Sequence, residues 1–276
     1  MKIALTGASG LVGSRITELL SSHFEFISLP QEDVDITAKD SVERALEMLS
    51  YDLFLHLAAY TDVDKAEKNS GLAYAVNVDG TRNLFEATQK AKKPFIYIST
   101  DFVFSGTNPV YDEASTPEPI SVYGKTKYEG EQLVKDRAMI VRFSYPYRAH
   151  CPEKKDFATR VRELMLAGKE LSMVEDETMT PTFIDDIAYS LKHLFTHFSP
   201  EVFHIVGSSS MSPYEAGKTI ARVFDIKDAH IRPVSYKEFF AGHAPRPQYA
   251  TLKSTKNTFH TMKNFEDGMR EVGLQL

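Results

Sequence analysis

The chain has 276 residues, which allows one large domain or two smaller ones of about 150 residues each. Hydrophobic residues make up 42% of it and charged residues 25%, as in soluble globular proteins, and the net charge of −6 argues against a nucleic-acid or anionic-membrane surface. The single cysteine, Cys151, excludes an intrachain disulfide and fits a reducing cytosol, where we expect an inert thiol.

The N-terminal segment "MKIALTGASG" enters an alternating apolar pattern at once. It has neither the long apolar region nor the cleavage site of a signal peptide. The chain also lacks an apolar run of the length that spans a bilayer. We therefore expect a cytoplasmic protein that does not enter the membrane.

Short apolar segments alternate with amphipathic ones through the first half of the chain. The expected strands are rich in β-branched and aromatic residues, and they are 2–7, 24–29, 52–59, 94–100 and 138–144. The expected helices have apolar residues at i, i+3 and i+4, and they are 11–22, 41–50, 71–91 and 123–136. This alternation predicts an α/β fold, a Rossmann-type doubly wound parallel sheet built from right-handed βαβ units.

The alternation loosens after about residue 145. The expected elements are strands over 170–176 and 201–207 and helices over 157–169, 182–198 and 211–225. Gly168 is the expected C-cap of the first of these helices, Asp185 or Asp186 the N-cap of the second, and Ser212 with Pro213 the start of the third. This part is expected to form a smaller lobe interwoven with the first.

The segment "TGASGLVG" places Gly7, Gly10 and Gly13 between the first strand and the first helix. Glycines here allow a tight turn, close approach of the backbone to a pyrophosphate and close packing of helix on strand. The helix N-terminus adds unpaired N–H groups and a partial positive charge. The other turn residues expected at the cofactor are Ser9, Leu11 and Val12. The first part of the chain is therefore predicted to bind a dinucleotide.

The end of the second strand bears on the choice of cofactor. It reads "ISLPQED" and has no acidic residue at its tip to hold a ribose 2′-hydroxyl. This favours NADP(H) over NAD(H), with Arg15 or Ser28 as neighbours of the 2′-phosphate. The tip has no basic residue either, so both cofactors stay open.

Tyr123 and Lys127 lie one helical turn apart in "YGKTKYEGE". A nearby ammonium is expected to lower the pKa of the phenol from about 10, so that the tyrosine can protonate a carbonyl oxygen while hydride reaches the adjacent carbon. The alternative is an ordinary exposed pair on an amphipathic helix. The glycine turn upstream favours the catalytic interpretation.

Together these motifs resemble the extended short-chain dehydrogenases/reductases, and finer matches resemble their dTDP-4-dehydrorhamnose reductase branch. The resemblance covers nearly the whole chain. It rests on "HLAAYTDVDKAE" (56–67), "VNVDGTRNL" (76–84), "STDFVFSG" (99–106), "YGKTKYEGE" (123–131), "TPTFIDDIA" (180–188) and "PRPQYATL" (245–252).

The resemblance implies a set of cofactor contacts beyond the glycine turn. Asp35 and Ile36 would lie near the adenine, Ala58 and Ala59 would line the cofactor trough, and Thr61 would lie close to the nicotinamide ribose. It also implies two domains. The NAD(P)-binding domain would cover 1–145, with 180–207 returning to it, and 146–276 would be mostly the substrate-binding lobe.

The resemblance also implies the catalytic and substrate contacts. Thr100 would bind the sugar carbonyl beside Tyr123, the general acid, while Lys127 would lower the pKa of Tyr123 and bind the ribose. Asn77 would shape the active site, or it is a satisfied polar side chain of its helix. The expected substrate contacts are Asp101, which could instead be a turn residue, Phe102, Tyr145 and Arg246. The reaction implied is hydride transfer from NAD(P)H to C4 of a nucleotide-linked 4-keto-6-deoxy sugar.

The chain departs from this branch where the sugar would bind. Tyr145 stands where members commonly have a tryptophan, and Tyr249 and Ala250 replace Asn-Ser of some members. Arg246 could still pair with the substrate pyrophosphate. These changes leave the sugar and its nucleotide undetermined.

Other functions also fit parts of the sequence. The same branch includes the regulatory subunits of methionine adenosyltransferase, which would bind NADP without turnover. An epimerase or dehydratase is disfavoured because "STD" lacks the Asp-Glu pair of dehydratases. His193 and His197 lack the glutamate of HExxH, so no metal site is expected. The helices over 71–90 and 123–135 could pair across a homodimer.

Overall fold

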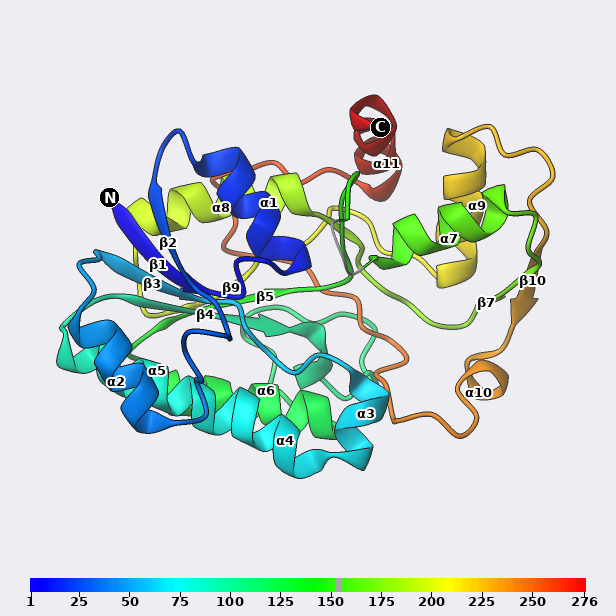
Figure 1. Cartoon of the computed structure of the whole chain (residues 1–276). Helices are drawn as coiled ribbons and strands as arrows, with labels where there is room; N and C mark the ends of the chain where they lie inside the picture. Colours follow the sequence, from blue (N-terminus) through cyan, green and yellow to red (C-terminus); the bar gives the residue numbers. More distant parts are fainter. Residues whose placement is uncertain (152–154) are drawn as a thin grey trace.

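The computed structural model describes residues 1–151 and 155–276, and its central feature is a parallel β-sheet (Figure 1). In these residues six strands form the sheet in the order β2-β1-β3-β4-β5-β9, and each neighbouring pair is parallel. The strands are β1 (Lys2–Thr6), β2 (Glu25–Leu29), β3 (Leu53–His56), β4 (Phe95–Thr100), β5 (Met139–Phe143) and β9 (Val202–His204). The doubly wound α/β fold predicted from the sequence is confirmed.

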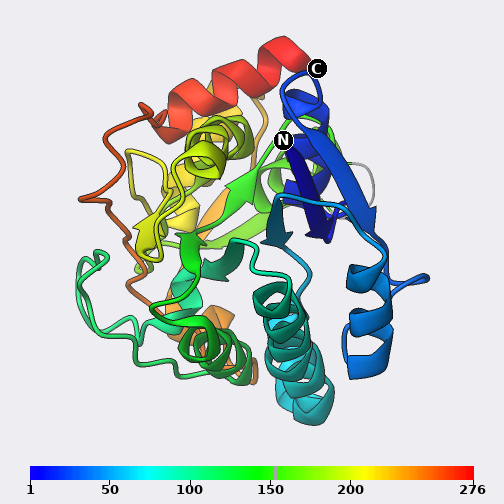
Figure 2. The ribbon, with the colours of Figure 1, turned by 90° about the vertical axis from the view of Figure 1, so that its left-hand side faces the viewer.

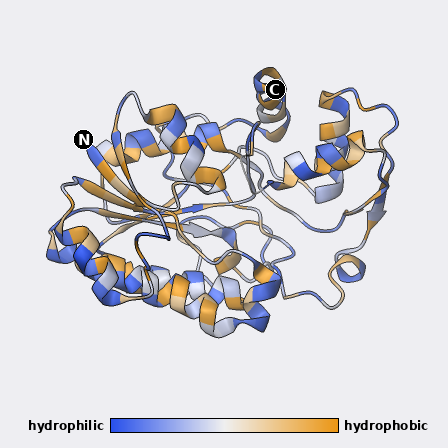
Figure 3. Ribbon diagram, viewed as in Figure 1, coloured by the Kyte–Doolittle hydropathy of each residue, from blue (hydrophilic) through white to orange (hydrophobic). Residues whose placement is uncertain are grey.

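Helices cover both faces of this sheet (Figures 1 and 2). One face carries α1 (Leu11–Leu20) and α8 (Ile184–Thr196), which pack on each other, and the opposite face carries α2 (Lys39–Glu47), α5 (Gly80–Lys90) and α6 (Val122–Val134). Strands β3 and β4 are buried along their whole length, as expected of a sheet covered on both sides. Hydropathy follows this arrangement, because the central strands are mostly apolar and the helices carry polar outer faces (Figure 3).

A smaller lobe lies beyond the carboxyl ends of the sheet strands (Figure 1). Its core is apolar and includes Met165, Met173, Phe265 and Met269. Its elements are β6 (Pro146–Tyr147) paired with β8 (Thr182–Phe183), β7 (Leu171–Val174) paired with β10 (Ile231–Val234), α7 (Phe157–Leu166), α9 (Pro213–Val223), α10 (Tyr236–Phe239) and α11 (Phe265–Gln275). Within the described residues we find no helix that combines the length and apolarity needed to cross a bilayer.

The ends of the predicted helices can be compared with the structure. Ser212 forms a capping box with Glu215 at the start of α9, as its position before Pro213 predicts. Gly168 follows the C-cap of α7 with a φ of 65°, the left-handed conformation that glycine adopts without strain.

The predicted cap of α8 is wrong. Phe183 occupies the N-cap, and Asp185 and Asp186 lie inside the first turn. Asp185 accepts two hydrogen bonds of 2.6 Å from the Arg15 guanidinium, and Asp186 accepts one of 2.8 Å from the Lys263 backbone N–H. Partners from distant parts of the chain therefore determine the role of these carboxylates.

The single helix predicted over 71–91 is divided in the structure. It consists of α4 (Ser70–Tyr74), a π-helical segment (Ala75–Asp79) and α5, and the short α3 (Val63–Lys68) precedes it. The π-helical segment contains Asn77, whose side chain is buried. Such wide turns are common beside functional sites because they reorient side chains inward.

Candidate functional site

A cavity of about 610 Å³ opens at the carboxyl ends of β1, β3, β4 and β5, between the sheet and the smaller lobe. Parallel α/β sheets bind ligands at this edge. The cavity is lined by most of the residues predicted from the sequence: Gly7, Ser9, Gly10, Leu11, Val12, Gly13, Ala58, Ala59, Thr61, Thr100, Phe102, Tyr123, Lys127 and Tyr145. Lys155, Asp156 and Phe157 of the smaller lobe line it as well.

The glycine turn forms one wall of this cavity. Gly7 has a φ of 71°, and the N–H of Gly10 donates to its carbonyl oxygen over 3.1 Å. A Cβ on Gly13 would collide with that same oxygen, so only glycine allows α1 to begin this close to the turn. Helix α1 starts at Leu11 with Gly10 as its N-cap, which leaves N–H groups free of a capping side chain and suits them to a phosphate.

The predicted contacts to the adenine half of a cofactor lie outside this cavity. Asp35 is exposed, and its carboxylate accepts hydrogen bonds from the N–H and hydroxyl of Thr37. Ile36 is half-buried beside Gly80. Their roles at the adenine stay predictions.

Arg15 is not available for a 2′-phosphate. Its side chain is nearly buried, and its guanidinium is held by Asp185, Glu18 and Gln275. Ser28 is exposed near the end of β2 and stays a candidate. The sequence alone could not exclude Arg15, because Asp185 and Gln275 are 170 and 260 residues away.

Thr100, Tyr123 and Lys127 meet on the opposite wall of the cavity. Thr100 ends β4, and the two other residues lie on α6, whose start is capped by Ser121. All three side chains are nearly buried. The Phe102 ring packs edge to face on Tyr123 with 5.4 Å between centroids. This arrangement brings a hydroxyl, a phenol and an amine to one place beside the glycine turn.

The electrostatic relation between Tyr123 and Lys127 differs from the prediction. Burial raises the pKa of Tyr123, a hydrogen bond with the Thr100 side chain opposes this shift, and the charge of Asp101 adds to it. Burial also lowers the pKa of Lys127, to about 7. The Lys127 ammonium donates to the Ile98 carbonyl oxygen over 2.7 Å and lies 4.1 Å above the Tyr97 ring. The expected lowering of the Tyr123 pKa is therefore wrong, because desolvation has the largest effect on this phenol.

Asp101 lies behind Thr100 and outside the cavity lining. Only 2% of it is exposed, and its two oxygens accept hydrogen bonds from the Thr100 hydroxyl (2.8 Å) and the Ser144 hydroxyl (2.6 Å). Burial raises its pKa to about 6. The predicted direct contact between Asp101 and the substrate does not fit this placement.

Asn77 connects the π-helical segment to the site. Its side-chain oxygen accepts from the Tyr60 N–H over 2.7 Å, and its amide nitrogen donates to the Thr126 hydroxyl over 2.9 Å. It is thus a satisfied polar side chain, and it also braces α6 next to Lys127. The structure thus confirms the interpretation of Asn77 as a satisfied polar side chain, and its role in shaping an active site stays a prediction.

Tyr145 lines the cavity, whereas its neighbours Glu177 and Arg246 lie outside the lining, and of the three only Glu177 was not predicted from the sequence. Tyr145 has a φ of 41°, and its hydroxyl donates to Glu177 over 3.2 Å. Glu177 is buried, which raises its pKa to about 7. Arg246 lies near both and pairs with Asp64 of α3 over 2.7 Å. Glu177 lies between β7 and β8 in a segment without a recognisable motif, so only the tertiary structure identifies it.

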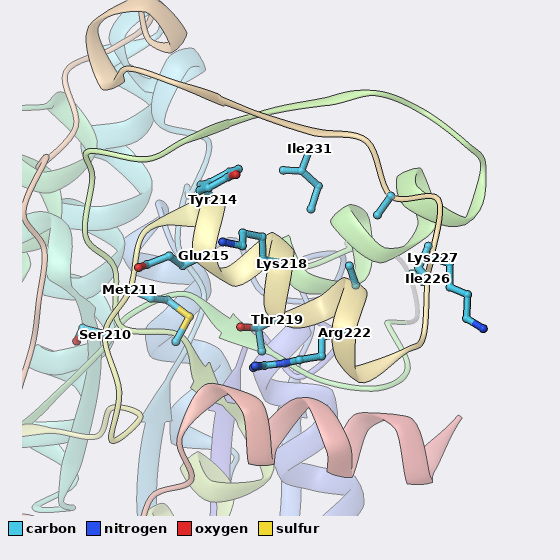
Figure 4. Close-up of a pocket in the computed structure, with 12 residues that line it drawn as sticks. Ser210, Met211, Tyr214, Glu215, Lys218, Thr219, Arg222, Ile226, Lys227 and Ile231 are labelled. Atoms are coloured by element: carbon cyan, nitrogen blue, oxygen red, sulfur yellow. The ribbon is translucent and has the colours of Figure 1, made fainter.

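A second cavity lies in the smaller lobe, along α9 and its neighbouring loop (Figure 4). Its cations already have partners: Lys218 lies over the Tyr214 ring and Arg222 pairs with Glu266. Among the described residues no cluster of three His, Cys, Asp or Glu side chains could hold a metal ion. The cavity beside the glycine turn is therefore the candidate site.

Comparison with known proteins agrees with this geometry. Residues 1–272 match the family described as the RmlD substrate binding domain. The chain is 34% identical over 236 residues to a probable low-salt glycan biosynthesis reductase of Haloferax volcanii (79% of each chain). It is 31% identical over 258 residues to the dTDP-4-dehydrorhamnose reductase of Sinorhizobium fredii (90% of this chain, 86% of that one).

A solved structure extends the comparison to three dimensions. The dTDP-4-dehydrorhamnose reductase of Bacillus anthracis, determined in complex with NADP, superposes with a TM-score of 0.93 at 32% identity. The match covers 100% of this chain and 99% of that one. Since the family match spans nearly the whole sequence and the relatives share its full architecture, this chain belongs to the RmlD substrate-binding domain family.

Proposed function

We propose that this protein is an NAD(P)H-dependent oxidoreductase that reduces the 4-keto group of a nucleotide-linked 6-deoxy sugar, in the manner of a dTDP-4-dehydrorhamnose reductase. The observation that carries the proposal is the convergence of Thr100, Tyr123 and Lys127 on one cavity with the Gly7–Gly13 turn. A protein that only binds a dinucleotide needs the glycine turn. An enzyme that also delivers a proton to a carbonyl oxygen needs the buried hydroxyl groups of Thr100 and Tyr123 as well.

The residues present fit a dinucleotide. A Cβ on Gly7 or Gly13 would collide with backbone atoms of the protein itself, so glycines keep the turn tight, and the start of α1 offers N–H groups to a pyrophosphate. Ala58 and Ala59 line the trough between this turn and Thr100. When bound, the reduced nicotinamide supplies a hydride to the carbonyl carbon.

Side chains of this protein supply the proton and set the pKa of the group that donates it. Tyr123 keeps its proton at neutral pH because burial raises its pKa, which suits a general acid that protonates the sugar oxygen. Lys127 lies one turn further along α6, where its ammonium would move from the Ile98 carbonyl to a ribose hydroxyl. Such a cation would then favour the tyrosinate left after proton transfer.

The substrate would extend from Thr100 toward Arg246. Tyr145 lines the cavity where a sugar ring would lie, and Arg246 would exchange Asp64 for the substrate pyrophosphate. NADP(H) is the proposed preferred cofactor, because the tip of β2 has no carboxylate facing a ribose 2′-hydroxyl.

The test is the oxidation of NADPH, followed by absorbance, with dTDP-4-dehydro-6-deoxy-L-mannose as substrate and NADH in parallel. We expect turnover in the wild type and a loss of at least about 100-fold in Tyr123→Phe. The control is NADPH affinity, which the phenylalanine should leave unchanged. Tight NADPH binding without oxidation of this or other nucleotide-linked keto-sugars would contradict the proposal. It would favour the regulatory subunit of methionine adenosyltransferase as the nearer functional relative.

A further inference from the structure

Asp101 is a buried carboxylate that touches the proposed catalytic centre only through a neighbour. It lies outside the cavity lining and is 2% exposed. One of its oxygens accepts from the Thr100 hydroxyl over 2.8 Å and the other from the Ser144 hydroxyl over 2.6 Å. Asp101 therefore has no direct contact with the cavity, and any effect on a substrate passes through the Thr100 hydroxyl, which lines the cavity.

The protonation state of Asp101 limits what Thr100 can do. A hydroxyl has one proton, and an ionised carboxylate can only accept. While Asp101 is ionised, the Thr100 proton points to it, and the Thr100 oxygen also accepts weakly from the Phe102 N–H over 3.3 Å. In that state the Thr100 oxygen meets the Tyr123 side chain with lone pairs only, and Thr100 has no proton left for a ketone oxygen.

Protonation of Asp101 reverses this arrangement. The carboxylic acid can donate its proton to the Thr100 oxygen, and the Thr100 proton is then free to turn toward the cavity. There it would meet the oxygen that Tyr123 protonates, at the point where negative charge develops during hydride transfer. We propose, resting on the reductase function above, that Asp101 is a positioning residue: Thr100 donates to the ketone oxygen only while Asp101 carries a proton.

Both states are accessible near neutral pH. Burial raises the pKa of Asp101 to about 6, against hydrogen bonds from Ser144 and Thr100 that favour the ionised form. Three titratable groups face it, namely Tyr123 from α6, Tyr145 after β5 and Glu177 between β7 and β8, and the charge of Asp101 raises the pKa of each. Of these, Glu177 titrates with a pKa of about 7, and Lys127 on the cavity wall does so as well, so the test has to separate the Asp101 step near pH 6 from both.

The experiment measures single-turnover hydride transfer as a function of pH. A preformed complex of enzyme and NADPH is mixed with the keto-sugar between pH 5 and 9. In the wild type we expect the rate to fall as the pH rises, through a step near pH 6. The fall should be about 100- to 1000-fold, the effect of losing one hydrogen-bond donor to a developing oxyanion.

Three variants identify the group responsible. Asp101→Asn can donate an amide N–H to Thr100 at every pH while its oxygen accepts from Ser144, so the step should vanish and the rate at pH 8 should exceed that of the wild type. Thr100→Val should also lose the step, because it has no hydroxyl to orient. Glu177→Gln should retain it. A step near pH 6 that persists in Asp101→Asn, or an equal loss of rate at every pH in that variant, overturns the proposal; a step near pH 7 belongs to Lys127 or Glu177.

A second measurement does not depend on turnover. The infrared band of the protonated Asp101 carboxyl should appear as the pH is lowered from 8 to 5 and should be absent in Asp101→Asn. In Thr100→Val this band should shift, because the acid has lost its acceptor; an unshifted band overturns the proposed hydrogen bond. If the wild type reduces no keto-sugar, the proposed function fails, and the infrared result still decides whether Asp101 directs the Thr100 hydroxyl.

Discussion

The buried amine of Lys127 should make the stability of the ligand-free protein depend on pH in a defined way. The residue is 4% exposed, and its pKa is lowered from an ordinary 10.5 to about 7. Between these two values the unfolded chain keeps a proton that the folded protein has released. The unfolded state thus binds more protons, and the free energy of unfolding rises with pH across this window. Below about pH 7 both states are protonated, and this gain is lost.

The magnitude follows from the two pKa values. One pKa unit corresponds to about 1.4 kcal/mol. Between pH 7 and pH 9 the folded amine passes from half-protonated to neutral while the unfolded amine stays charged, so this residue should contribute about 2 kcal/mol of added stability. Substitution by methionine keeps the length of the side chain and removes the titration.

The assay is urea unfolding of the cofactor-free protein at pH 7, 8 and 9, with the wild type and Lys127→Met compared at each pH. The difference between the two proteins isolates this group, because all other titrations are shared. Lys125→Met, an exposed lysine on the same helix, is the matched control and should follow the wild type. A stability difference between wild type and Lys127→Met that does not change with pH would refute the lowered pKa of the buried Lys127 amine.

Three further substitutions test other parts of the structure. Arg15→Met should destabilise the protein by about 3–5 kcal/mol in urea unfolding, because it leaves the Asp185 carboxylate buried without its partner, and a cost below about 1 kcal/mol would contradict that role. Arg246→Met should raise KM for the nucleotide sugar by about 10- to 100-fold with little change in NADPH affinity. An unchanged KM would show that Arg246 pairs with Asp64 only to stabilise the fold. Ser212→Ala should lower the free energy of unfolding by about 1 kcal/mol through loss of the helix cap, whereas Ser212→Gly should lower it less.

Local patterns in the sequence are sufficient for the architecture and the position of the site. Strand and helix periodicity predicts the parallel sheet, and "TGASGLVG" predicts the turn that forms one wall of the cavity. The start of α9 at Ser212 and the end of α7 before Gly168 follow from capping preferences. These features are determined by residues within a few positions of each other, which is why they can be read without coordinates.

The charge state of the site depends on packing between distant segments. The sequence places Tyr123 and Lys127 one turn apart and so predicts that the ammonium lowers the phenol pKa, whereas burial in the structure shifts both pKa values toward the neutral forms. Arg15 pairs with Asp185, and Asp101 accepts a hydrogen bond from Thr100 without lining the cavity.

The physical reason is that a pKa and a hydrogen-bond partner depend on desolvation and on three-dimensional neighbours, and neither is encoded in local spacing. Asp101 illustrates this. One of its partners, Thr100, is the preceding residue, but the other, Ser144, is 43 residues away and only the fold brings it close. Local sequence patterns are therefore enough to predict the fold and the glycine turn and to propose Thr100, Tyr123 and Lys127 as reacting side chains, whereas the pKa values and hydrogen-bond partners of these groups follow from how distant segments pack.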